Sequence, residues 1–142
     1  MTLQAILSPL FVEVVLTFAL MLLMGALRQG NYRSGVVKPQ DIALHEPKWP
    51  ARTAQVAHSF SNQFELPVLF YVLTILALVT KQAGLLFVVL AWIFVACRLG
   101  QAYVHVTSNI VRLRGAFYIV GAVVLMAMWV IFIVGIYAGR TI

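Results

Sequence analysis

The chain has 142 residues, of which 63% are hydrophobic and 10% are charged. Soluble domains average roughly 45–50% apolar and 25% charged residues, so this composition excludes an ordinary soluble domain. The net charge of +6 is spread over short connections between apolar stretches, which excludes a folded basic surface for nucleic acid. The single cysteine, Cys97, excludes an intramolecular disulfide.

Four apolar stretches are each long enough to cross a bilayer, which takes about 20 helical residues. They predict helices over residues 5–27, 51–80, 85–107 and 114–138. Because these stretches occupy most of the chain, residues 1–142 are expected to form a single four-helix membrane domain. The predicted fold class is therefore an all-α integral membrane protein, a multi-pass up-down bundle of four transmembrane helices surrounded by membrane lipid.

The first span is expected to be a retained helix rather than a cleaved signal peptide, because no basic residue precedes it and its apolar run is too long. It is nearly uniformly apolar apart from Glu13, which is expected either to snorkel or to pair between subunits. The glycines and prolines of the connection that follows disfavour a long helix there. Its polar residues Asp41, His45 and Glu46 are expected to be solvated.

The second span contains a proline that is expected to bend it. Pro67 cannot donate a backbone hydrogen bond to Gln63, so a kink is predicted near Asn62 and Glu65. Polar side chains at that level can satisfy the freed backbone groups. The connection over residues 80–84 is short, which predicts that the second and third spans are antiparallel neighbours.

The distribution of lysine and arginine predicts the orientation in the membrane, since these residues favour cytoplasmic loops. The basic residues of the first and third connections are Arg28, Arg33, Lys38, Lys48, Arg52, Arg112 and Arg114. Those on the opposite side are Lys81 and Arg140. Both termini are therefore expected on the non-cytoplasmic side.

Two polar stripes lie within the second and third spans. Their members are His58, Asn62 and Glu65 in the second span and Arg98, Gln101 and His105 in the third. Spacings of three and four place each set on one helix face, and charged groups in hydrocarbon are expected to face the bundle interior and pair. At the helical rise of about 1.5 Å per residue, Glu65 and Arg98 lie at similar depths, which predicts an ion pair between them.

Each of these polar groups has a structural and a functional interpretation. A buried ion pair alone can serve as a clamp that fixes helix register. The surplus of polar groups around it favours a bound anionic ligand instead. Arg112 and Arg114 are either membrane anchors or part of that ligand site. His58 and His105 are expected to form hydrogen bonds rather than bind a metal, because no further histidine or cysteine completes a closed site.

The second and third spans resemble a known family. The run from Asn62 through Glu65 to Pro67 is similar to the Asn/Glu/Pro signature of the membrane-associated proteins in eicosanoid and glutathione metabolism, the MAPEG family. Arg98, with polar residues three and seven positions later and arginines opening the fourth span, resembles the same family. The chain length, the four spans and the long first loop agree, so the resemblance covers essentially the whole chain. Within the family, the chain resembles a bacterial-type member.

The resemblance implies a homotrimer in a bacterial inner (cell) membrane, with glutathione held between subunits on the cytoplasmic side. The residues assigned to glutathione binding are Asn62, Glu65, Arg98, His58, Gln101 and His105. Guanidinium groups suit the two carboxylates of glutathione, and a nearby positive charge favours its reactive thiolate. Arg114 best matches the catalytic, thiolate-stabilising residue, with Arg112 second. A hydrophobic small-molecule electrophile would enter from the lipid.

The sequence departs from the family pattern at two positions. His58 stands where an arginine is usual, and His105 stands where a tyrosine is usual. Histidine is neutral about half the time or more near pH 7, which weakens a carboxylate clamp. The leading function is a glutathione-dependent transferase or peroxidase, and the alternative is a non-catalytic binding or accessory subunit that uses the polar interior for assembly or for lipid or anion binding. Solute or proton movement is a third interpretation, which the lack of an inverted repeat disfavours.

Overall fold

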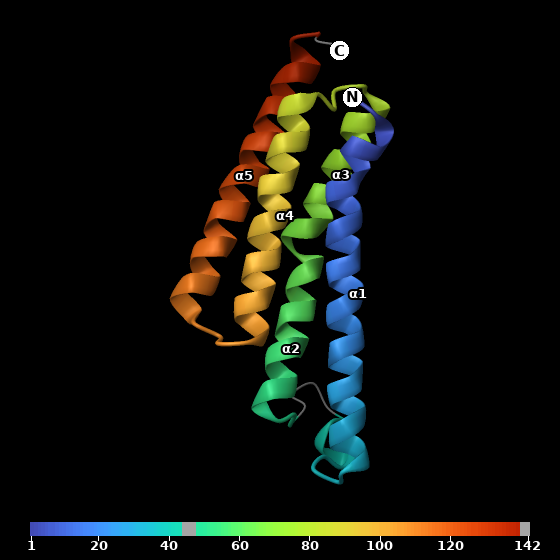
Figure 1. Ribbon diagram of the computed structural model, residues 1–142, viewed down its shortest axis with the longest axis vertical. Coiled ribbons are helices and arrows are strands. Elements are labelled where there is room, and N and C mark those ends of the chain that lie inside the picture. The colour runs from blue at the N-terminus through green and yellow to red at the C-terminus, as the bar shows by residue number, and fades with distance from the viewer. Residues whose placement is uncertain (44–47, 140–142) are drawn as a thin grey trace.

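The computed structural model describes residues 1–43 and 48–139, and these form helices joined by short connections (Figure 1). The helices are, in chain order, α1 (Leu3–Arg33), α2 (Ala51–Ser61), α3 (Leu66–Val79), α4 (Leu85–Val106) and α5 (Val111–Tyr137). Short 3₁₀ turns are η1 (Pro39–Asp41) and η2 (Asn62–Phe64). No strand occurs in the part of the chain that is described. His45 and Glu46, expected to be solvated, lie outside it.

Four helical segments are long and apolar enough to cross a membrane, with α2 and α3 together forming one of them. This confirms the all-α class and the four predicted spans. The spans alternate in direction, and the two termini lie at the same end of the bundle (Figure 1). The location of the termini on the non-cytoplasmic side stays a prediction. The assembly into a homotrimer also stays a prediction.

Helix α1 is longer than the sequence indicated, because it continues past residue 27 and ends at Arg33. The glycine-rich connection was expected to stop it earlier. A side-chain hydrogen bond holds its last turn, in which Asn31 Nδ2 donates to Thr53 Oγ1 of α2 at 2.5 Å. The backbone N–H of Ser34 then caps the helix by donating to the carbonyl oxygen of Gly30 at 3.0 Å. Contact with α2 therefore keeps this turn helical in spite of its glycine.

The second span is broken where the proline predicted a kink. Helix α2 ends at Ser61, the 3₁₀ turn η2 follows, and Glu65 has φ −97° and ψ −104°, outside the helical region. Pro67 lies in the first turn of α3, where its missing N–H costs no helical hydrogen bond. The backbone is redirected at this point, so the side chains before and after the break do not follow one continuous helix face.

The apolar core lies between α3, α4 and α5. Its buried members are Phe70, Leu73, Ala91, Phe94, Val95, Leu125 and Met128. The rings of Phe70 and Phe94 contact each other with centroids 4.9 Å apart, so the antiparallel helices α3 and α4 pack together as predicted. Helices α4 and α5 approach closely at Gly100, where an added Cβ would lie 2.7 Å from Cε1 of Phe117.

Helix α4 is the innermost of the four spans. Half of its most apolar stretch is buried, against 11% for α1 and 17% for α5. Large apolar side chains on α1 and α5 are exposed, as expected for helices that meet lipid or another subunit. The inner position of α4 explains why Arg98, Gln101 and His105, all on this helix, are buried.

Candidate functional site

Arg98 lies at the centre of the polar interior. Its side chain, on α4, is 1% exposed. Nη2 donates to the backbone carbonyl oxygen of Asn62 at 2.8 Å, and Nη1 donates to Oε1 of Gln101 at 2.5 Å. Nε lies 3.7 Å from Oε1 of Glu13 on α1. One guanidinium group therefore connects α1, the break in the second span and α4.

The predicted ion pair between Glu65 and Arg98 is wrong, because Arg98 pairs with Glu13 and Glu65 is exposed. The prediction assumed that one α-helix carries His58, Asn62 and Glu65. The 3₁₀ turn and the non-helical torsion angles of Glu65 break that periodicity, so the carboxylate leaves the inward face.

Glu13 neither snorkels nor pairs between subunits, and both expectations for it are wrong. Its side chain is fully buried within the chain that carries it. Among the described residues neither carboxylate oxygen has a hydrogen-bond partner, so the ion pair with Arg98 is its polar contact. An isolated charge in such surroundings is costly, and each member of the pair compensates the other.

A second set of polar contacts surrounds His105 near the end of α4. Its ring Nδ1 lies 3.5 Å from Nδ2 of Asn62, and its side chain is buried. Nε2 of Gln55 donates to the carbonyl oxygen of His105 at 2.5 Å and to that of Thr107 at 3.4 Å. This interior position confirms the expectation that His105 forms hydrogen bonds within the bundle. By contrast, His58 is exposed.

Gln55 is a member of the polar interior that the sequence interpretation missed. It lies on α2, seven residues or two helical turns before Asn62, which follows the last residue of that helix. The stripe therefore starts one turn earlier than the interpretation placed it. Extending the three-and-four spacing backwards from His58 would have found Gln55 from the sequence.

The two arginines that open the fourth span have different surroundings. Helix α5 begins at Val111, ahead of the expected residue 114, so both arginines lie in its first turn. Nη1 of Arg114 donates to Oδ1 of Asn109 at 2.6 Å, and the Arg114 side chain is half-buried. Asn109 has a φ of 50°, in the left-handed region that asparagine tolerates better than most residues. Arg112 is exposed.

An apolar cavity of about 200 Å³ lies between α4 and the first turns of α5. Its lining residues are Cys97, Leu113, Ala116, Phe117 and Val120. Two of them flank Arg114 within one turn of α5. Arg114 itself does not line the cavity, so the two are neighbours along the first turns of α5.

Of the eight predicted site residues, the structure brings four together. These are Asn62, Arg98, Gln101 and His105. In the single chain, His58, Glu65 and Arg112 are exposed, and Arg114 bonds Asn109 in the α4–α5 connection. Glu13 and Gln55 join the interior group.

These features define a multi-pass helical membrane protein with a polar, charge-paired interior between its spans. A family model matches residues 6–134, nearly the whole chain, and its description is the MAPEG family. The chain therefore belongs to the MAPEG family, as the motifs of its second and third spans indicated. Searches among curated proteins and among solved structures gave no match.

Proposed function

We propose that this MAPEG protein is a glutathione-dependent transferase or peroxidase that acts on hydrophobic electrophiles at a cytoplasmic-side site between the subunits of a homotrimer. One observation carries the proposal. Glu65 lies within a membrane span, is exposed in the single chain, and follows directly on the break whose Asn62 carbonyl binds Arg98. A carboxylate facing hydrocarbon is costly, so a polar ligand and a neighbouring subunit are expected to cover it.

The residues around this surface suit a tripeptide. Glutathione has an ammonium group, which Glu65 is suited to bind, and two carboxylates, which attract arginine side chains. Arg114 is positioned to favour the thiolate, and Asn109 restricts its guanidinium group. The apolar cavity of about 200 Å³ between α4 and the first turns of α5 is suited to an apolar part of the second substrate.

The transferase step follows from these roles. The thiolate sulfur attacks an electrophilic carbon, a carbon–sulfur bond forms, and a leaving group such as chloride departs with the bonding electrons. The thiol proton is released to water before the attack. Arg114 stabilises the negative charge on sulfur, while Glu65 binds the ammonium group of the tripeptide and Arg98 holds the break that positions Glu65.

Two measurements test the proposal on the purified protein in detergent. Millimolar glutathione is expected to raise the melting temperature, and the protein is expected to conjugate glutathione to 1-chloro-2,4-dinitrobenzene. Arg114→Ala is expected to remove the thiolate absorbance of the bound tripeptide, whereas the matched variant Arg112→Ala is expected to retain it. If glutathione neither stabilises the wild-type protein nor is consumed, the proposal is wrong.

A non-catalytic accessory subunit is the second candidate, and the contacts of Asn62 favour it. The Asn62 carbonyl bonds Arg98 and its side-chain amide lies beside His105, so this residue already has partners inside the chain. A binding subunit of this kind is expected to copurify with a lipid or a partner protein. It should lose that molecule in Glu65→Gln and show no turnover with glutathione.

A further inference from the structure

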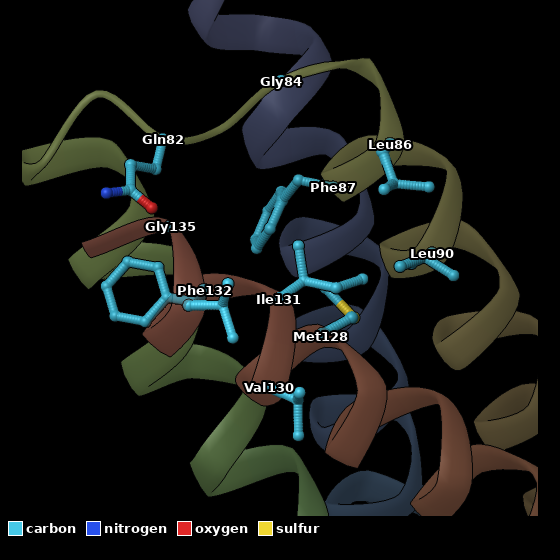
Figure 2. Close-up of a pocket in the computed structure, with 11 residues that line it drawn as sticks. Gln82, Gly84, Leu86, Phe87, Leu90, Met128, Val130, Ile131, Phe132 and Gly135 are labelled. Atoms are coloured by element: carbon cyan, nitrogen blue, oxygen red, sulfur yellow. The ribbon is translucent and has the colours of Figure 1, made fainter. Parts of the chain in front are cut away.

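A cavity of about 410 Å³, drawn in Figure 2, lies between the first turns of α4 and the last turns of α5, at the end of the bundle where Figure 1 marks the two termini. The lining side chains used below are Leu90 on α4, Phe132 on α5 and Gln82 in the α3–α4 connection. This volume falls within the range of roughly 300–1,000 Å³ that is usual for small-molecule sites.

The cavity is separate from the proposed glutathione site. Arg114 lies in the first turn of α5, whereas the lining residue Gly135 lies in the last turn. At a helical rise of 1.5 Å per residue the two positions are about 30 Å apart. A molecule bound in this cavity is therefore too distant to react at Arg114, so the cavity serves a different ligand from the proposed electrophile.

One side-chain amide, that of Gln82, makes one end of the otherwise apolar cavity polar. Gln82 extends from the α3–α4 connection toward Gly135 (Figure 2). A Cβ atom added at Gly135 would lie 2.5 Å from Oε1 of Gln82, so the glycine makes room for the amide. The amide oxygen faces Gly135 in Figure 2, and no hydrogen bond between described residues involves this side chain. A half-turn of the amide, which exchanges its oxygen and nitrogen, therefore directs its N–H groups to an acceptor at the same place.

The surroundings identify the kind of ligand. The other lining side chains are apolar, and Leu86, Val130 and Ile131 among them are exposed on the outer surface of two membrane-spanning helices. The cavity therefore opens toward lipid. Gln82 lies between two spans, at the end of the bundle, where a bilayer presents its glycerol and headgroup region. An apolar cavity with one hydrogen-bond donor at its membrane-surface end suits an amphiphile, which has an apolar chain and a polar end. It does not suit ordered water, because a buried water molecule needs several polar partners.

We propose that this cavity binds one acyl chain of a membrane phospholipid, whose ester carbonyl oxygen accepts a hydrogen bond from the Gln82 side-chain amide. The chain runs from Gln82 past Leu90 and Phe132 toward the bundle interior. The small residue at position 135 keeps the amide at the mouth of the cavity. Binding of this lipid does not depend on glutathione or on any catalytic activity.

Tryptophan fluorescence provides a direct test. The indole of Trp129 packs edge-to-face on Phe132, with centroids 6.1 Å apart, and lies about 9 Å along α5 from Gly135 at a rise of 1.5 Å per residue. The intact chain with Trp49→Phe and Trp92→Phe keeps Trp129 alone as the reporter. In unbrominated detergent, small additions of phosphatidylcholine brominated in the middle of its acyl chains are expected to quench Trp129 along a saturable curve.

Two variants separate a bound lipid from general contact with detergent. Leu90→Phe narrows the cavity and is expected to abolish saturable quenching, whereas the matched change Leu99→Phe on the exposed side of α4 is expected to preserve it. Gln82→Leu keeps the cavity and removes the hydrogen-bond donor. The concentration of brominated lipid that gives half of the maximal quenching is expected to rise about fivefold. Gln82→Leu also serves as the test if Leu90→Phe does not fold.

Other outcomes overturn the proposal. Quenching that rises linearly with brominated lipid and is the same in Leu90→Phe and Leu99→Phe shows only general contact with the micelle. An unquenched Trp129 shows that the cavity is closed to lipid or covered by a second copy of the chain. Equal half-saturation points for the wild-type protein and Gln82→Leu contradict the assigned role of the amide.

Discussion

Helices α4 and α5 carry two regions of opposite character. Near the α4–α5 connection, buried polar groups on α4 are bound by partners from α1, α2 and η2. At the other end, the same helices enclose an apolar cavity with one amide at its mouth. Removing one member of a buried charge pair leaves an uncompensated charge. A small group added at the mouth of the cavity, as at Gly135, meets only the end of a flexible glutamine side chain. Substitutions in the polar region are therefore expected to cost much more stability.

The largest effect is expected at the pair formed by Glu13 and Arg98. Glu13→Ala leaves the guanidinium group buried without its countercharge, which costs roughly 3–5 kcal/mol for pairs of this kind. Equilibrium unfolding in mixed detergent measures the loss. The double variant Glu13→Gln/Arg98→Met is expected to be more stable than Glu13→Ala, because no buried charge remains.

The matched control for this pair is Glu65→Gln, at the carboxylate that is exposed in the single chain. We expect it to cost much less free energy of unfolding than Glu13→Ala, because no described residue forms an ion pair with Glu65 within the chain. A loss as large as that of Glu13→Ala would show that Glu65, not Glu13, compensates Arg98.

The next effect is expected where α4 and α5 approach most closely. Gly100→Ala brings a methyl group within 2.7 Å of the Phe117 ring, and overpacking of this kind costs roughly 1–3 kcal/mol. Phe117→Leu is expected to restore part of the loss in the double variant. Gly25→Ala is the control, because nothing lies within 4 Å of its added Cβ, and it is expected to stabilise the protein by roughly 0.5–1 kcal/mol. Equal effects of both substitutions on thermal unfolding would contradict the close packing.

A smaller effect is expected at the extended last turn of α1. Thr53→Val removes the acceptor of the Asn31 side chain and is expected to cost about 1 kcal/mol. Hydrogen exchange of the amides in this turn should become faster. Thr80→Val serves as a control because its hydroxyl group bonds only a carbonyl of its own helix at 2.8 Å. Unchanged exchange in Thr53→Val would show that the turn does not depend on α2.

The smallest effect on stability is expected in the apolar region. Gly135→Ala places a Cβ near Oε1 of Gln82, but a flexible glutamine side chain can turn away. The free energy of unfolding is expected to change by about 0.5 kcal/mol or less, as for surface substitutions. If Gly135→Ala lowered the free energy of unfolding as much as Glu13→Ala does, the apolar region would be as sensitive to substitution as the polar region, which would contradict the comparison.

The spans and the break could be predicted from the sequence because their causes are local. Apolar length defines each span, and Pro67 cannot continue the hydrogen bonding of the second one. The face of α4 that carries Arg98, Gln101 and His105 was also predicted correctly, since α4 is an unbroken helix. Helical spacing holds only within such a helix, and this is why the same reasoning failed for Glu65.

The role of Glu13 could not be predicted because it depends on packing between helices. The residues around it in α1 are almost uniformly apolar, so no periodic pattern indicates which face of α1 turns inward. Depth pointed to Glu65 as the partner of Arg98, and Glu13 was expected to snorkel or to pair between subunits. The contact of α1 with α4 decides between them, and that contact involves residues far apart in the sequence.

The hydrogen bond from Arg98 to the Asn62 carbonyl has a consequence for the insertion of the chain into the membrane. The bilayer interior offers no water to a carbonyl oxygen at a helix break. Within the second span this group accepts a long hydrogen bond of 3.5 Å from the backbone N–H of Glu65, and a charged donor at 2.8 Å comes only with Arg98 of the third span. Likewise, Arg98 lacks its acceptor if the third span enters alone. We therefore expect these two spans to enter the bilayer together as a helical hairpin, rather than as two independent helices.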